Sequence, residues 1–230
     1  MTSAPALPTG DAKASAVRSM FDTIAPRYDL VNRLMTFGMD RGWRKRAVAS
    51  LSLDTGATVI DVACGTGDLC RDLARCGYRP VGVDLSTGML AHARTSAPLA
   101  QGDGLRLPFA DGRVDGAVSG FALRNFVALD PVLAELARVL RRGGRIALLD
   151  VATPANPLIR TGHAVYFGQV VPRIGGLLSD GAAYRYLPRS VAYLPTVADL
   201  LDLVRDAGFD AVERRLLSGG IAQLITATRR

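Results

Sequence analysis

A loop that contains two glycines is the part of this sequence best suited to chemistry. Residues 59–67 read Val-Ile-Asp-Val-Ala-Cys-Gly-Thr-Gly, so an apolar run leads into a turn at Gly65 and Gly67. Glycines there let a ligand lie against the backbone, because a larger side chain would collide with it. Asp84 ends the next apolar run, where its carboxylate can accept hydrogen bonds from a ribose. The loop and Asp84 together predict a nucleoside-binding site.

The loop departs from the fingerprint of dinucleotide-binding proteins. The third glycine of the pattern G-x-G-x-x-G is missing, because Cys70 occupies its position. Asp61, just before the loop, offers a carboxylate to a ligand that carries an ammonium group. S-adenosyl-L-methionine carries an ammonium group, a ribose and an adenine, but no pyrophosphate. We therefore predict S-adenosyl-L-methionine as the cofactor, while a role of Asp61 in capping a helix stays open.

The elements that must position these residues form an alternating pattern. Apolar, β-branched runs predict strands at residues 58–62, 80–83, 116–119 and 145–151. Helical patterns fall between them at residues 68–76, 87–94 and 131–141. Such alternation predicts βαβ units and a parallel sheet, with ligands at the carboxyl ends of the strands. A helix at 197–207 and an antiparallel hairpin of residues 212–217 and 221–228 follow at the end of the chain.

We expect a single domain over residues 1–230. It consists of five segments: a disordered lead (1–13), a helical cap (14–52), a cofactor-binding core (53–154), a lid or substrate region (155–195), and a closing helix and hairpin (196–230).

Composition limits the partners of this domain. The net charge of +7 comes almost entirely from arginine, since Lys13 and Lys45 are the only lysines. No basic block interleaved with aromatic residues supports nucleic-acid binding. No uninterrupted apolar run reaches the roughly 18–20 residues that a membrane span requires. We expect a cytosolic protein that binds weakly to the inner face of the membrane, through a basic face with Arg41, Arg44, Lys45 and Arg46.

Cysteine and histidine spacing predicts no metal site. Cys64, Cys70 and Cys76 are six residues apart, and His92 and His163 lie far from each other. We interpret the cysteines as reduced thiols.

Further segments carry a more specific pattern. Residues 21–32 read FDTIAPRYDLVN, residues 38–46 read GMDRGWRKR, and residues 120–125 read GFALRN. Residues 102–109 hold Gly-Asp-Gly and Leu-Pro-Phe, and related motifs occur between 172 and 195. Together these segments resemble the UbiE/MenG family of quinone-biosynthesis C-methyltransferases over about residues 20–222. The segment 120–125 is close to the family pattern G-F-G-L-R-N and is its most specific part.

The resemblance implies a fold, a reaction and a site. The fold is that of class I S-adenosylmethionine-dependent methyltransferases, a Rossmann-like α/β fold with a seven-stranded, mostly parallel sheet and an antiparallel last strand. The reaction is C-methylation of a prenylated quinol, with conversion of demethylmenaquinol to menaquinol favoured. The candidate cofactor-binding residues are Asp61, Cys64, Gly65, Thr66, Gly67, Asp84, Leu85, Asp103, Gly104 and Gly120.

The resemblance also places three residues beside the acceptor, namely Tyr28, Arg124 and Asn125. The Arg124 guanidinium suits a phenolate oxygen, because it stays charged and donates in a fixed plane. No His or carboxylate stands out as a general base, so a water relayed by these three residues is our choice.

Several alternatives stay open. In these alternatives, Arg124 and Asn125 simply end a strand, Tyr28 is a core aromatic residue, and Asp103 forms an Asx-turn. Ala122 replaces a family glycine, and the C-terminus lacks a family histidine, which leaves the quinone undetermined. A methyltransferase for a soluble aromatic metabolite and a non-catalytic cofactor-binding subunit are competing functions, and a homodimer is neither required nor excluded by the sequence.

Overall fold

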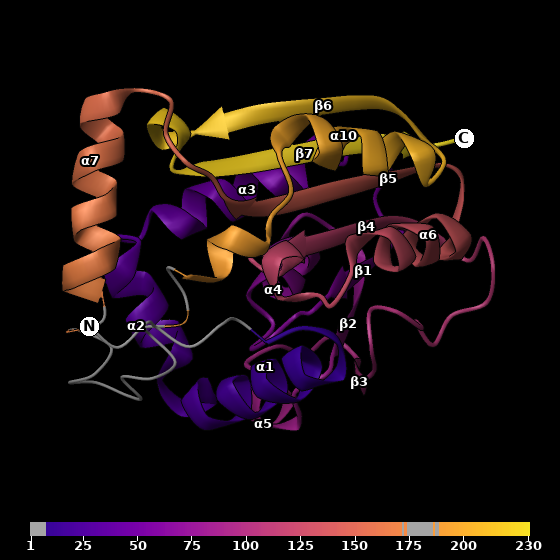
Figure 1. Cartoon of the computed structure of the whole chain (residues 1–230). Helices are drawn as coiled ribbons and strands as arrows, with labels where there is room; N and C mark the ends of the chain where they lie inside the picture. The colour runs from indigo at the N-terminus through magenta and orange to yellow at the C-terminus, as the bar shows by residue number, and fades with distance from the viewer. Residues whose placement is uncertain (1–7, 172, 174–185, 187–188) are drawn as a thin grey trace.

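The computed structural model describes residues 8–171, 173, 186 and 189–230, and all statements below refer to these residues. They form a seven-stranded sheet in the order β3-β2-β1-β4-β5-β7-β6 (Figure 1). The pairs from β3 to β5 are parallel, and β7 is antiparallel to both neighbours, as expected. The strands are β1 (Thr58–Val62), β2 (Arg79–Asp84), β3 (Leu99–Gln101), β4 (Val114–Gly120), β5 (Leu140–Val151), β6 (Phe209–Leu217) and β7 (Ala222–Arg229).

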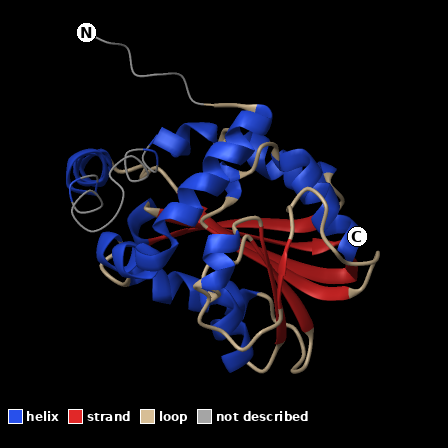
Figure 2. Ribbon diagram, turned by 90° about the horizontal axis from the view of Figure 1, so that it is seen from below, coloured by secondary structure: helices blue, strands red, loops and turns tan. Residues whose placement is uncertain are grey.

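Helices cover both faces of this sheet (Figure 2). The covering helices are α3 (Met39–Ser50) and α4 (Asp68–Arg75) on one face, and α6 (Leu129–Val139) and α10 (Val197–Asp206) on the other. Helical spacing of apolar residues explains the packing, since Leu129, Leu133 and Leu136 of α6 share one side and are buried. Helices therefore cover both faces of the sheet, and the ends of its strands are the part that a ligand can reach.

The N-terminal helices lie across the carboxyl ends of the first strands. They are α1 (Gly10–Ile24), the turn η1 (Ala25–Arg27) and α2 (Tyr28–Met35). The expectation of a disordered lead up to residue 13 is wrong for residues 10–13, because α1 already begins at Gly10. Lys13 explains this start: it is 3% exposed, and its Nζ donates a hydrogen bond of 2.6 Å to the carbonyl of Phe126.

Other boundaries differ in detail. The helix expected at 131–141 begins two residues earlier, at Leu129. Pro131 permits this start, because it lies in the first turn, where a backbone nitrogen has no intrahelical partner. The helix expected at 87–94 is α5, and it ends at Ala91. The sequence does not predict the short strand β3, since its three residues, two half-buried and one exposed, carry no periodicity. The closing hairpin of β6 and β7 is confirmed through the turn η5 (Ser218–Gly220).

A helix beyond the sheet, α7 (Pro157–Val165), continues into a π-helical turn, η3 (Tyr166–Val170). Asn156 caps α7, because its Oδ1 accepts the Leu158 N–H at 2.9 Å. Most of the motif-bearing segment at 172–188 lies outside the described residues; the turn η4 (Val191–Tyr193) follows it. Among the described helices, none has the length and apolarity to cross a bilayer.

Candidate functional site

The glycine loop joins β1 to α4, and backbone conformation explains its two glycines. Gly65 has a φ of +55° and Gly67 a φ of +80°, which L side chains rarely adopt. A Cβ on Gly67 would also lie 2.6 Å from Cγ2 of Thr95. At Gly65, the atom nearest to an added Cβ is the Met89 sulfur, 4.0 Å away. Both glycines are thus required by the turn itself, and Gly65 additionally leaves room beside the loop.

Asp84, at the end of β2, holds the loop in place. Its Oδ2 accepts the N–H of Gly65 at 2.7 Å, and its Oδ1 accepts the N–H of Ser86 at 2.8 Å. Burial raises the pKa of the Asp84 carboxyl above its ordinary value, and these two hydrogen bonds oppose the rise. Each carboxylate oxygen retains a second lone pair, so the group can accept further hydrogen bonds from a ligand.

A narrow cleft of about 100 Å³ lies beside this carboxylate, beneath α1. It brings together many of the predicted site residues: Tyr28, Gly65, Asp84, Leu85, Asp103, Gly104, Gly120 and Asn125. Asp103 also forms the alternative Asx-turn, because its Oδ1 accepts the Leu105 N–H at 3.0 Å. A Cβ on Gly104 would lie 2.8 Å from the Phe126 ring, so a larger residue there would force that ring to shift. The two proposed roles of Asp103 are compatible.

The predicted residues Asp61, Cys64, Thr66 and Gly67 do not line the cleft. Asp61 is 1% exposed; its Oδ2 accepts a hydrogen bond of 3.4 Å from the Cys70 thiol, and its Oδ1 has no partner in the described chain. Burial raises the pKa of Asp61 to about 7. Thr66 donates through Oγ1 to Oδ1 of Asp29 at 2.5 Å, which ties the loop to α2. These four residues belong to the loop or pack against it, on the side away from the cleft. Their contact with a cofactor stays a prediction.

A second, larger cavity of about 580 Å³ lies next to the cleft. Phe21, Tyr28 and Phe121 line both spaces, so the two adjoin. The larger cavity is bounded mainly by side chains of α2, α3, α7 and η3, most of them apolar or aromatic. The aromatic contact of Phe37 with Tyr166, with ring centroids 5.2 Å apart, joins the end of α2 to η3. This cavity suits a flat, apolar molecule.

Arg124 and Asn125 belong to the turn η2 (Leu123–Asn125) after β4. Arg124 lines the larger cavity and forms an ion pair with Asp150, which is fully buried at the end of β5. Its Nε donates to Oγ of Ser190 at 3.1 Å, and its Nη1 donates to the carbonyl of Phe121 at 2.8 Å. The guanidinium charge is therefore compensated by Asp150.

Sequence reasoning missed Asp150, although an available signal marked it. Asp150 ends an apolar strand, as Asp61 and Asp84 do, and the carboxyl ends of neighbouring parallel strands meet at one edge of the sheet. Asn125 lines the narrow cleft, with its Nδ2 3.4 Å from the Phe121 carbonyl. Arg124 and Asn125 thus face different spaces.

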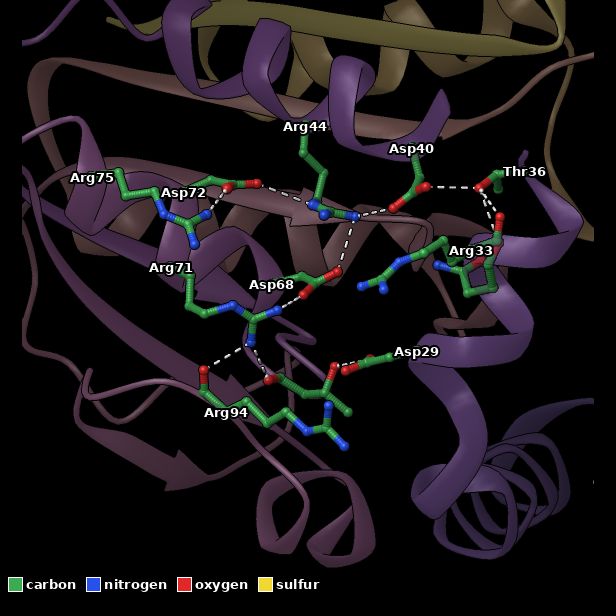
Figure 3. Close-up of polar contacts among 12 residues, drawn as sticks. Asp29, Arg33, Thr36, Asp40, Arg44, Asp68, Arg71, Asp72, Arg75 and Arg94 are labelled. Atoms are coloured by element: carbon green, nitrogen blue, oxygen red, sulfur yellow. Dashed lines mark hydrogen bonds and ion pairs between the residues drawn. The ribbon is translucent and has the colours of Figure 1, made fainter. Parts of the chain in front are cut away.

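A buried charge network fixes α3 to the helix that follows the glycine loop. Figure 3 shows Arg44 between three carboxylates, those of Asp40, Asp68 and Asp72. Its Nη1 lies 3.0 Å from Oδ2 of Asp68, and its Nε lies 3.1 Å from Oδ2 of Asp72. The expectation that Arg44 belongs to an exposed basic face is wrong, because Arg44 is buried and three carboxylates compensate its charge.

The sequence matches one known protein family over almost its whole length. The model of the ubiE/COQ5 methyltransferase family matches residues 9–229. A ubiquinone/menaquinone biosynthesis C-methyltransferase UbiE from Syntrophotalea carbinolica is 43% identical, with 92% of this chain and 93% of the relative covered. A demethylmenaquinone methyltransferase from Deinococcus radiodurans is 41% identical, with both chains covered completely.

Solved structures share the fold at lower identity. Phosphoethanolamine N-methyltransferase 2 of Haemonchus contortus, in complex with S-adenosyl-L-methionine, is 15% identical with a TM-score of 0.60, over 81% of this chain and 52% of that one. A SAM-dependent methyltransferase from Aquifex aeolicus is 16% identical with a TM-score of 0.59, over 81% of this chain and 89% of that one. The class I methyltransferase fold expected from the sequence is confirmed.

Proposed function

The chain belongs to the ubiE/COQ5 methyltransferase family, and we propose that it methylates a ring carbon of a prenylated naphthoquinol of the demethylmenaquinol type. It is an S-adenosyl-L-methionine-dependent methyltransferase. Several relatives of this chain are named demethylmenaquinone methyltransferases, which supports this choice of acceptor.

The residues of the narrow cleft fit the cofactor. The carboxylates of Asp84 and Asp103 would accept hydrogen bonds from the ribose and the adenine side, and Gly65 and Gly104 would let these groups approach the backbone. When bound, the cofactor supplies a methyl group on a sulfonium, which is already an activated electrophile. The contribution of the chain is therefore to position the acceptor, exclude water and provide a base.

The observation that carries the choice of acceptor is the large apolar cavity that adjoins the cleft. At about 580 Å³, it has the size of a site for a ring system and part of an isoprenoid chain. Tyr28 lies at the junction and would position the ring there. Arg124, with its charge compensated by Asp150, would donate to a ring oxygen without leaving an unpaired charge in the cavity.

An assay with the acceptor in two redox states tests this function. A quinone ring is electron-poor, whereas a deprotonated quinol places negative charge on the carbon next to its oxygen. We expect methyl transfer from labelled S-adenosyl-L-methionine to a short-chain demethylmenaquinol under anaerobic reducing conditions, detected by mass spectrometry. Equal transfer to the oxidised quinone would contradict the proposed chemistry.

The same assay separates the competing functions. Preference for a naphthalenediol without a prenyl chain would favour a soluble aromatic acceptor. Tight cofactor binding with no transfer to any quinol would favour a non-catalytic subunit.

Weak membrane binding is part of this proposal, through a surface that differs from the expected one. Leu34 on α2, Phe37 in the turn after α2 and Leu158 on α7 are 45%, 73% and 83% exposed, and α2 and α7 bound the larger cavity. Arg41 and Arg160 are exposed basic residues on α3 and α7. Apolar side chains flanked by basic ones favour an anionic lipid surface. A lipid-borne acceptor would reach the cavity there.

A further inference from the structure

We propose that His163 is the base that takes the proton from a ring hydroxyl of the acceptor, with Tyr166 as the residue that orients this hydroxyl. The inference rests on the proposed function, because it assigns a role within the same cavity. It replaces the relayed water that the sequence favours.

Elimination among the cavity residues points to His163. The titratable side chains that line the cavity in the described structure are those of Tyr28, Arg124, Arg160, His163 and Tyr166, and no carboxylate is among them. Arginine remains protonated in proteins, and tyrosine gives up its proton only near pH 10. The imidazole alone can accept a proton near neutral pH.

Two buried polar atoms, on residues that line the cavity, lack hydrogen-bond partners in the described chain. Nε2 of His163 and Oη of Tyr166 are both buried, and neither has a partner in the described part of the chain. A buried polar group without a partner is unfavourable, so a ligand that supplies the missing hydrogen bonds is stabilised there. The two residues are three positions apart on the continuous helix of α7 and η3, and they therefore project from the same side.

The surroundings of the imidazole keep it neutral. The ring of Phe167 lies 4.3 Å from that of His163, with Tyr166 packed against Phe167 at 5.6 Å. Burial lowers the pKa of His163 below its ordinary value. Arg124 and Arg160 are the cationic residues of the described cavity lining; Asp150 compensates the charge of Arg124, and Arg160 is exposed. At neutral pH the ring is therefore ready to accept a proton.

The step balances without a further reagent. The O–H bond of the ring hydroxyl breaks, an N–H bond forms at Nε2, and the electron pair stays on the ring oxygen. The products are an imidazolium and a phenolate, whose charge spreads to the neighbouring ring carbon. The imidazolium then releases its proton to solvent.

A pair of histidine variants tests the base. In His163→Gln we expect turnover to fall by about 100-fold or more at unchanged cofactor affinity, the usual effect of losing a general base. The wild-type rate should decline as pH falls through the lowered pKa of His163, and this decline should be absent from the residual activity of the variant. His92→Gln is the matched control, because His92 is exposed directly after α5 and lines neither space. Imidazole should partly restore His163→Gly.

Wild-type turnover and an unchanged pH profile in His163→Gln would overturn the assignment. Tyr166→Phe should chiefly raise KM, since the oxygen that orients the hydroxyl is lost while the base remains.

A measurement without methyl transfer distinguishes failure of this inference from a folding defect and from failure of the proposed function. His92→Gln retains His163 as its one histidine, so its imidazole signal can be titrated by NMR. We expect reduced 1,4-dihydroxynaphthalene to shift the titration midpoint, and 1,4-dimethoxynaphthalene, which has no hydroxyl proton, to leave it unchanged. Unchanged midpoints with both probes would contradict the assignment. A shift in an enzyme that methylates no quinol would instead overturn only the proposed function.

Discussion

The narrow cleft proposed for the cofactor and the larger cavity proposed for the acceptor adjoin, yet they are built in different ways. The cleft rests on strand ends, and main-chain N–H groups hold its central carboxylate, as for Asp84 with Gly65 and Ser86. The cavity is bounded by helices joined through side chains, such as the aromatic contact of Phe37 with Tyr166. A site fixed by the backbone tolerates little change, whereas a site made of side chains adapts to different acceptors. Under the proposed function, the sheet would bind the cofactor and the helices would select the acceptor.

Removing the buried ion pair between Arg124 and Asp150 should have the largest effect. Asp150→Ala leaves the Arg124 guanidinium buried without its counter-charge, so we expect a loss of about 3–5 kcal/mol in the free energy of unfolding. Denaturant titration measures it. Asp210→Ala, whose pair with Arg230 is exposed, should change stability by less than about 1 kcal/mol. Equal small losses would mean that the acceptor side depends on side-chain packing alone.

The cofactor side should respond in binding more than in stability. Asp84→Ala should weaken S-adenosyl-L-methionine binding by about 1–3 kcal/mol, because ribose hydroxyls lose their acceptor. Calorimetry gives the dissociation constant. Tyr166→Phe, on the acceptor side, is the control and should bind the cofactor as the wild type does. An unchanged constant in Asp84→Ala would remove this carboxylate from the cofactor site.

Asp61, which is buried next to the loop, should make the free energy of unfolding depend on pH. Its pKa of about 7 lies above the value near 3.9 in an unfolded chain, so the folded state binds more protons between these values. Its stabilising contribution is full below pH 4 and is lost as pH rises to 7, with a slope of at most about 1.4 kcal/mol per pH unit. Asp61→Asn should remove this slope. The same slope in wild type and variant would show that another group titrates.

The smallest effect is expected at the mouth of the cavity. Phe37→Ser should lower partition onto anionic vesicles several-fold, and added salt should lower it further in both proteins. Sedimentation with vesicles measures it. Leu216→Ser is a matched control, because Leu216 is 48% exposed on β6 and lines neither space. Vesicle binding that both variants reduce equally would exclude a specific surface.

Local pattern determined much of this protein. The runs of apolar residues predicted most strands, and the loop with Gly65 and Gly67 predicted the turn at the end of β1. These features depend on residues close in the chain, where period and turn chemistry act directly. The same holds for the hairpin of β6 and β7.

Only the tertiary structure decided which charges are compensated and which polar atoms are left for a ligand. Arg124 and Asp150 are 26 residues apart, and Arg44 reaches Asp72 across 28 residues, so no spacing rule revealed these pairs. His163 became a candidate base only when packing buried its Nε2 without a partner beside the acceptor cavity. The physical reason is that the energy of a charged or polar group depends on its desolvation and its partners, and both are set by residues that folding brings together from distant parts of the chain.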